Sequence, residues 1–235
     1  MAFLNIIKNW FKPAQSCPTN DPVIQEDWSK ALVMLDNGHG INTPGKRSPD
    51  GTLLEYKYNR EIVKRIKAQL DELGINYYIV VPEEKDIKLS TRVNRANKKY
   101  EEAKKEGVTA FFISVHVNAA GNGGWRNARG WSGWTSKGQT KGDKLADCLY
   151  EAAHEVCDPK KLQIRTDKWS DGDEDWESNF YVLKNTNCAA CLTENFFQDN
   201  HEDVDYLLSE EGMQDVTKIH VEGIKKYIRK YINKK

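Results

Sequence analysis

The chain has 235 residues, of which 39% are hydrophobic and 30% are charged, and this is enough for one domain with a buried core. Its 35 basic and 35 acidic residues balance, whereas general nucleic-acid binders carry a basic excess, so we expect no nucleic-acid partner. The sequence has no apolar run of about 18 residues, so we expect no integral membrane segment.

Residues 1–30 form a predicted N-terminal extension, because their prolines interrupt regular secondary structure. The apolar stretch at the start is broken by Lys8, Asn9 and Lys12, whereas a secretory signal needs about 7–15 uninterrupted apolar residues. We therefore expect no clear signal peptide, and a functional domain over residues 31–235. The five cysteines are odd in number and scattered, which indicates synthesis in a reducing compartment rather than a disulfide framework.

Buried strands and amphipathic helices alternate along the first half of this domain. Residues 31–36 form a continuous apolar run, which is typical of a strand buried in a parallel sheet. Residues 59–73 carry apolar side chains at helical spacing, and a glycine follows as a helix end. A β-rich strand is predicted over 75–81. The next helix, which ends near Gly107, leads into a second buried strand over 109–115.

The second half continues this alternation. We expect, in chain order, a strand over 130–135, a helix over 141–156, a polar loop over 158–178, strands over 180–183 and 189–193, and a closing helix over 209–232. Strands that alternate with helices predict an α/β sandwich with a mainly parallel sheet. In such sheets, ligands bind at the carboxyl ends of the strands.

Residues able to do chemistry follow three of the predicted strands. His39 comes after the first strand, His116 ends the central one and Glu194 ends the last, while Glu55 lies just ahead of a helix. Two histidines and one carboxylate form a catalytic zinc set that leaves a position for water, and the other carboxylate is free to transfer protons. Taken singly, each residue also fits an ordinary polar position at a strand end or helix start. Their joint placement favours the metal site.

Five motifs in register carry a resemblance to a known family. In chain order they are Asp36-Asn37-Gly38-His39-Gly40, Glu55 with Asn59, Arg92 to Asn97, Ser114 to Asn118, and Leu192-Thr193-Glu194-Asn195-Phe196-Phe197. In order and spacing, the chain resembles the catalytic domain of zinc-dependent N-acetylmuramoyl-L-alanine amidases of the cell-separation and endolysin type. The resemblance covers about residues 31–232.

The resemblance implies one Zn²⁺ ion held by His39, Glu55 and His116, with Glu194 as the catalytic carboxylate. It implies a single three-layer domain with a twisted, mostly parallel sheet of about six strands flanked by helices. The implied reaction is hydrolysis of the amide bond between the N-acetylmuramoyl lactyl group and L-alanine of peptidoglycan. Such an enzyme would be made in the bacterial cytoplasm and act on the cell wall, as a phage-type lysin or as a remodelling enzyme.

Two further residues are predicted to bind substrate. Asn118 closes the central strand motif, where it orients a ligand or substrate unless it serves only in a turn. Trp131 lies in a Trp- and Gly-rich stretch and would stack on a sugar ring or peptide, although core packing explains it equally well. Trp131 and Trp134 have opposite strand parity, so at most one of them is expected to face a groove. The acidic segment 169–177 lacks the pattern of a helix–loop–helix calcium site, so we expect a solvated loop.

Three other functions are compatible with parts of this pattern. A zinc peptidase acting on stem peptides would use the same metal set and would differ in the bond that it cuts. A non-catalytic peptidoglycan-binding protein would have no need for all four residues of the set. A dinucleotide-binding enzyme is disfavoured, because no GxGxxG turn follows the first strand.

Overall fold

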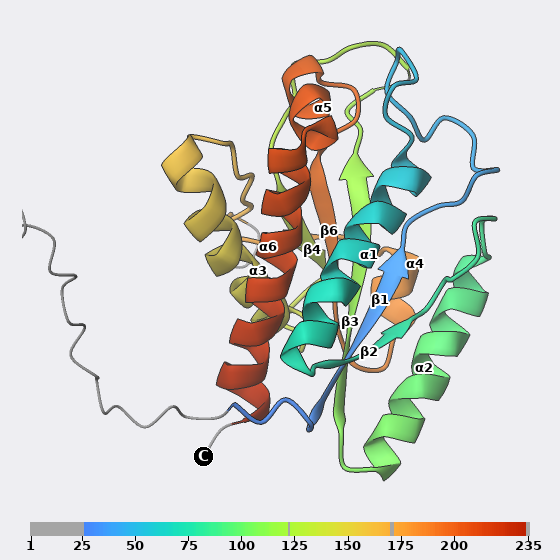
Figure 1. The fold of residues 1–235 in the computed structure, drawn as a ribbon, viewed down its shortest axis with the longest axis vertical. Coiled ribbons are helices and arrows are strands. Elements are labelled where there is room, and N and C mark those ends of the chain that lie inside the picture. Colours follow the sequence, from blue (N-terminus) through green and yellow to red (C-terminus); the bar gives the residue numbers. More distant parts are fainter. Residues whose placement is uncertain (1–25, 122, 170–171, 234–235) are drawn as a thin grey trace, which may run out of the picture.

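The computed structural model describes residues 26–121, 123–169 and 172–233. A six-stranded sheet runs in the order β2-β1-β3-β6-β4-β5 (Figure 1). Neighbouring strands are parallel except β4 and β6, which are antiparallel. The strands are β1 (Ala31–Asn37), β2 (Asn76–Ile79), β3 (Thr109–Asn118), β4 (Ser132–Thr135), β5 (Trp176–Glu177) and β6 (Ala189–Phe197).

Helices cover both faces of the sheet, which confirms the predicted three-layer α/β fold. Helices α1, α3 and α6 pack together over one face, and α2 and α4 lie against the other (Figure 1). None of the described helices is long and apolar enough to span a membrane. The helices are α1 (Glu55–Leu73), α2 (Leu89–Lys105), α3 (Asp143–Cys157), α4 (Tyr181–Asn185), α5 (His201–Leu208) and α6 (Glu210–Tyr227), with a 3₁₀ turn over Asp158–Lys160 and a π-helical turn over Ile228–Ile232.

The continuous apolar run of β1 follows from its place between two helical layers. Val33 and Leu35 belong to the core on the side of α1 and α6, whereas Leu32 and Met34 belong to the core on the side of α2. Successive side chains of a strand point to opposite faces, so a strand covered on both faces needs an apolar residue at every position. All seven residues of β1 are buried, and this strand is therefore a rigid support for the loop that follows it.

Two predictions for the second half of the chain are wrong. Residues 158–178 were expected to form a polar loop, but Trp176–Glu177 is the short strand β5, which pairs with β4. Residues 180–183 were expected to form a strand, but Tyr181–Asn185 is the short helix α4. Its apolar residues are buried in the core beside α2, and a short apolar run does not distinguish a strand from a buried helical turn. His201 begins α5, because the side chain of Asn200 caps that helix by accepting a hydrogen bond from the Asp203 N–H.

The boundary between the predicted N-terminal extension and the domain stays a prediction. Residues 1–25 lie outside the described residues. The described part begins just before β1, where Trp28 is buried in the core and its carbonyl accepts a hydrogen bond from the Ala31 N–H.

His220 lies inside the protein and connects α6 to β6. Its Nδ1–H donates to the Val216 carbonyl at 2.7 Å, and its Nε2 accepts from the Thr193 hydroxyl at 2.9 Å. Acceptance at Nε2 requires the neutral ring, and burial lowers the pKa of His220 from 6.5 to about 4. These contacts give His220 a structural role.

We expect His220 to reduce the stability of the protein in acid. Between pH 6.5 and about 4 the unfolded chain binds a proton at this residue and the folded protein does not, so the free energy of unfolding falls as pH falls. The loss due to this residue at pH 5 is about 2 kcal/mol. Urea unfolding of the wild type and His220→Gln at pH 7.5 and pH 5 would measure it. Equal losses in the two proteins would contradict the prediction.

Candidate active site

The carboxyl ends of β1, β3 and β6 lie side by side, because these strands are adjacent and parallel. His39 follows β1 by two residues, and His116 and Glu194 are paired directly across β3 and β6. Glu55 is the first residue of α1. The sheet thus brings together four residues that are up to 155 positions apart in the sequence.

His39, Glu55 and His116 form a tight cluster of possible metal ligands. One ligand atom from each lies within 4.8 Å of the others, and among the described residues this is the sole group of three or more His, Cys, Asp or Glu side chains so arranged. Glu55 Oε1 lies 3.4 Å from His39 Nε2 and 3.2 Å from His116 Nδ1. The two rings are nearly perpendicular, with centroids 4.9 Å apart. Both nitrogens therefore face the same carboxylate.

The second oxygen of Glu55 indicates that a cation belongs in this cluster. Oε1 also accepts a hydrogen bond from the Val117 N–H at 3.1 Å, but Oε2 is buried and has no hydrogen-bond partner. A buried carboxylate oxygen without a partner is unfavourable, and a divalent ion would satisfy it. Two imidazoles and one carboxylate are the donor set of a catalytic zinc site with an open coordination position. The residues present fit the ion that the resemblance implies.

The protonation states of the cluster also suit a cation. Burial lowers the pKa of His39 to about 4, which keeps that ring neutral and able to donate a lone pair. Burial opposes ionisation of Glu55, but the His116 hydrogen bond and the charges of both histidines outweigh it and lower its pKa. Burial also opposes charging of His116, but Glu55 and Glu194 raise its pKa. A metal ion would replace the proton that His116 shares with Glu55.

Glu194 lies beside the cluster but is not one of its three close members. Its Oε2 is buried and has no hydrogen-bond partner. Burial raises the pKa of Glu194 to about 7, with the charge of His116 opposing part of that rise. A carboxyl group with a pKa near neutrality can both take and return a proton at physiological pH, as a general base and acid must.

His39 is held in an uncommon backbone conformation. Its φ of 60° lies in the left-handed region, which a non-glycine residue adopts only when surrounding contacts stabilise it. Arg60 supplies such contacts, because its Nη1 and Nη2 donate to the His39 carbonyl at 3.0 and 3.1 Å. Asn59, from the same helix, donates to the carbonyl of Gly38 at 3.2 Å. These contacts fix the backbone that carries the His39 ring.

Gly38→Ala is expected to weaken metal binding at least about tenfold. A Cβ at position 38 would lie 2.4 Å from His116 Cε1 and 2.5 Å from its Nδ1, so the ring would have to move from its place beside Glu55. Loss of ligand geometry lowers metal affinity directly. Competition with a chelating dye would measure the affinity. Gly124→Ala, with open space around it and no positive φ, is a control for the added methyl group. An unchanged zinc affinity in Gly38→Ala would show that the ring position tolerates the shift.

A buried ion pair under the site was not assigned by sequence reasoning. Arg92 was quoted only as part of a motif, but its Nη1 donates to Asp36 Oδ1 at 2.8 Å, and both residues are at most 2% exposed. Asp36 also accepts a hydrogen bond from the Ser114 hydroxyl at 2.7 Å. The sequence does contain a signal that Arg92 is buried. Arg92 lies four positions before Ala96, and therefore on the apolar face of the predicted helix.

The prediction that Trp131 binds substrate is corrected by the structure. Trp131 is 0% exposed and presents no face to a ligand. Its indole N–H donates to Asn195 Oδ1 at 2.9 Å, and the Asn195 amide donates to the carbonyl of His116 at 2.9 Å. Trp131 therefore supports the strand that carries a metal-ligand candidate. Its neighbour Trp134 is half-buried and packs against Trp176 and Phe180.

An open cavity of about 550 Å³ joins the predicted residues. His39, Glu55, His116, Asn118 and Glu194 all line it. One wall is apolar and partly exposed, with Leu89 from α2 and Tyr181 from α4 at 52% and 44% exposure. The arrangement therefore combines a metal-ligand cluster, a proton-exchanging carboxyl group and space for a substrate.

The family comparison agrees with this geometry. Residues 33–226 match the model of a family described as N-acetylmuramoyl-L-alanine amidase. The chain belongs to this amidase family. The matched stretch includes all four residues of the predicted site.

Individual relatives of this amidase-family chain are distant. The endolysin of Bacillus phage SPP1 is 28% identical over 194 residues, which is 82% of this chain and 64% of the relative. The amidase CwlM of Bacillus licheniformis is 26% identical over 82% of this chain and 66% of its own length. The chain thus spans slightly less than two thirds of these curated relatives.

Solved amidase structures share the fold. An N-acetylmuramoyl-L-alanine amidase from Clostridium difficile 630 superposes with a TM-score of 0.70 at 25% identity, covering 86% of this chain and 100% of the other. AmiC2 of Nostoc punctiforme gives a TM-score of 0.70 at 24% identity, covering 87% and 100%. Each similarity covers more than four fifths of this chain.

Proposed function

We propose that this chain hydrolyses the amide bond between the lactyl group of N-acetylmuramic acid and L-alanine in peptidoglycan. The observation that carries the proposal is the cluster of His39, Glu55 and His116 around a buried, unpartnered carboxylate oxygen, with Glu194 beside it in an open cavity. Membership of the amidase family supports peptidoglycan as the substrate.

We propose one Zn²⁺ ion per chain, held by His39, Glu55 and His116. Zinc fits this donor set better than magnesium or calcium, which prefer oxygen ligands. When bound, the ion supplies a Lewis acid that makes water more acidic and polarises a carbonyl group. The three side chains would hold this ion in the wall of the cavity.

The proton transfers are assigned to Glu194. As a carboxylate it accepts a proton from the attacking water while the new C–O bond forms at the lactyl carbonyl. It then delivers that proton to the nitrogen of L-alanine as the C–N bond breaks, so the products are a carboxylic acid and a free amine. Asn118 Oδ1 accepts a hydrogen bond from the Ala119 N–H at 2.8 Å, so its amide nitrogen is the group proposed to donate to substrate.

We further propose residues 31–235 as the catalytic domain and the bacterial cell wall as its site of action. The family match over 33–226 supports this division. The similarity to a phage endolysin favours a lytic role, and the similarity to CwlM is equally consistent with wall remodelling.

The test is a digest of purified peptidoglycan by the protein as purified, after removal of metal by a chelator, and after zinc is restored. Mass spectrometry of the products identifies the bond that is cut. We expect intact glycan strands and free stem peptides that begin with L-alanine, lost with the chelator and regained with zinc.

Two results would overturn the proposal in different ways. Cuts within the stem would indicate a zinc peptidase. A protein that holds zinc and binds peptidoglycan, yet cuts no bond in it, would be a non-catalytic binding protein.

A further inference from the structure

The loop between β1 and α1 places a positive charge in the active-site cavity. Lys46 is half-buried and lines the same cavity as His39, Glu55 and Glu194. The cation therefore lies close to the position where the scissile bond would bind.

The backbone that carries Lys46 is fixed with respect to the metal-ligand cluster. The Lys46 carbonyl accepts a hydrogen bond from the Glu55 N–H at 3.0 Å. Arg47 pairs with Leu54 in an antiparallel bridge, and the Ser48 N–H donates to the Leu53 carbonyl at 2.9 Å. The loop thus folds back on itself and ends directly at Glu55. These contacts hold the backbone of Lys46 next to Glu55 at the cavity.

Lys46 has no acidic partner among the described residues. The neighbouring cations are engaged differently: Arg60 donates to the carbonyls of His39 and Glu83, and Arg92 is paired with Asp36 and Asp86. No described carboxylate lies within ion-pair distance of Lys46. A half-buried cation that faces a substrate cavity without a partner is suited to bind an anion of the substrate.

The chemistry of peptidoglycan limits which anion this is. The lactyl carboxyl group is consumed in the scissile amide, and the N-acetylated sugars are uncharged. The nearest carboxylate therefore belongs to the stem peptide, on the residue that follows L-alanine. In peptidoglycans where this residue is a γ-linked D-glutamate, its α-carboxyl group is either free or amidated.

We propose that Lys46 binds this α-carboxylate, so that the enzyme selects stems with a free carboxyl group over amidated stems. The inference rests on the proposed amidase function and adds a specificity determinant to it. Lys46 acts on binding and orientation of the peptide, whereas proton transfer belongs to Glu194.

The experiment compares two disaccharide–tripeptide substrates that differ only at this carboxyl group. With the zinc-loaded wild type we expect kcat/KM to be about 10- to 100-fold higher for the free acid, as for one charge-assisted hydrogen bond. Lys46→Met should lose this preference through a higher KM for the acid, with little change for the amide. Lys46→Arg should retain most of it.

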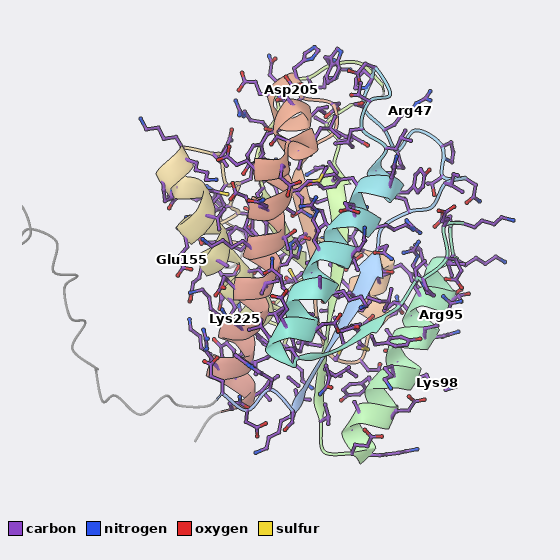
Figure 2. The ribbon with its side chains drawn as sticks, viewed as in Figure 1. Arg47, Arg95, Lys98, Glu155, Asp205 and Lys225 are labelled. Carbon is purple, nitrogen blue, oxygen red and sulfur yellow. The ribbon has the colours of Figure 1, made fainter. Side chains whose placement is uncertain are left out.

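Arg47→Met is the matched control. It removes the same charge from the adjacent residue, which is exposed and projects outward from the loop (Figure 2). We expect its substrate preference to equal that of the wild type. Zinc content and urea unfolding of each variant distinguish a specificity effect from a structural one.

A binding measurement separates failure of this inference from failure of the amidase function. Calorimetric titration with the dipeptide L-alanyl-D-isoglutamate should give tighter binding to the wild type than to Lys46→Met. The dipeptide in which the α-carboxyl group is amidated should bind the two proteins equally. Equal cleavage of both substrates by the wild type, or equal losses on both in Lys46→Met, would overturn the inference. If the wild type cuts neither substrate, the amidase function fails. If the wild type and Lys46→Met also bind the dipeptide equally, the role of Lys46 fails as well.

Discussion

Replacing Glu194 by glutamine is expected to reduce kcat on peptidoglycan by about 100- to 10,000-fold and to leave zinc bound. The amide has nearly the same shape as the carboxyl group but cannot exchange a proton. Because Glu194 is outside the three-residue ligand cluster, its loss should not release the ion. Burial raises the pKa of Glu194 to about 7, so the wild-type group is suited to take and return a proton near neutral pH.

The measurement pairs steady-state hydrolysis with metal analysis. Glu101→Gln, on the exposed side of α2, is the control for loss of one negative charge and should behave as the wild type. A Glu194→Gln protein that holds one zinc ion and retains full activity would remove Glu194 from the mechanism. A variant that loses zinc would instead place Glu194 among the ligands.

Replacing Arg92 by methionine is expected to lower the free energy of unfolding by about 3–5 kcal/mol, because it leaves the charge of Asp36 buried without its partner. Arg92 is 2% exposed and Asp36 is 1% exposed. The guanidinium also donates to the Asn37 carbonyl at 2.5 Å and to the Ile87 carbonyl at 2.9 Å. The variant therefore disconnects α2 from the end of β1, next to His39.

Urea unfolding of the metal-free protein would measure this effect without a contribution from zinc. Arg95→Met is the matched control on the same helix, since its ion pair with Glu83 is about one third exposed and should contribute at most about 1 kcal/mol. Figure 2 shows Arg95 on α2 at the edge of the molecule. The double variant Arg92→Met with Asp36→Val should be more stable than Arg92→Met alone, because it removes the unpaired charge. A loss below 1 kcal/mol in Arg92→Met would contradict the argument.

The sequence determined the layers of this protein and the ends of its sheet. Continuous apolar runs such as 31–36 and 109–115 predict strands buried on both faces, and periodic helices between them predict parallel pairing. Parallel strands place their carboxyl ends together, so His39, His116 and Glu194 were expected to meet. This is local information: it depends on the period of the side chains and on which residue follows each strand.

The assignment of Glu55 as a metal ligand depended on the family resemblance. The spacing of the residues alone did not decide whether Glu55 or Glu194 was the ligand. The structure brings Glu55 to both histidines because the loop after β1 folds back to the carboxyl ends of the strands. Helix α1 begins at that point, with Glu55 as its first residue. That return is made by contacts within the loop and between the loop and helix. No periodicity in the sequence specifies it.

Only the tertiary structure decided which side chains face solvent, core or cavity. Trp131 is fully buried and Lys46 faces the cavity, although aromatic and basic side chains suit either position. Tyr181–Asn185 forms a helix because its residues pack beside α2 outside the sheet, where no described strand pairs with them. Whether a side chain is buried or paired depends on residues that are distant in the sequence, as the ion pair of Arg92 with Asp36 shows. The residue type alone does not decide either outcome.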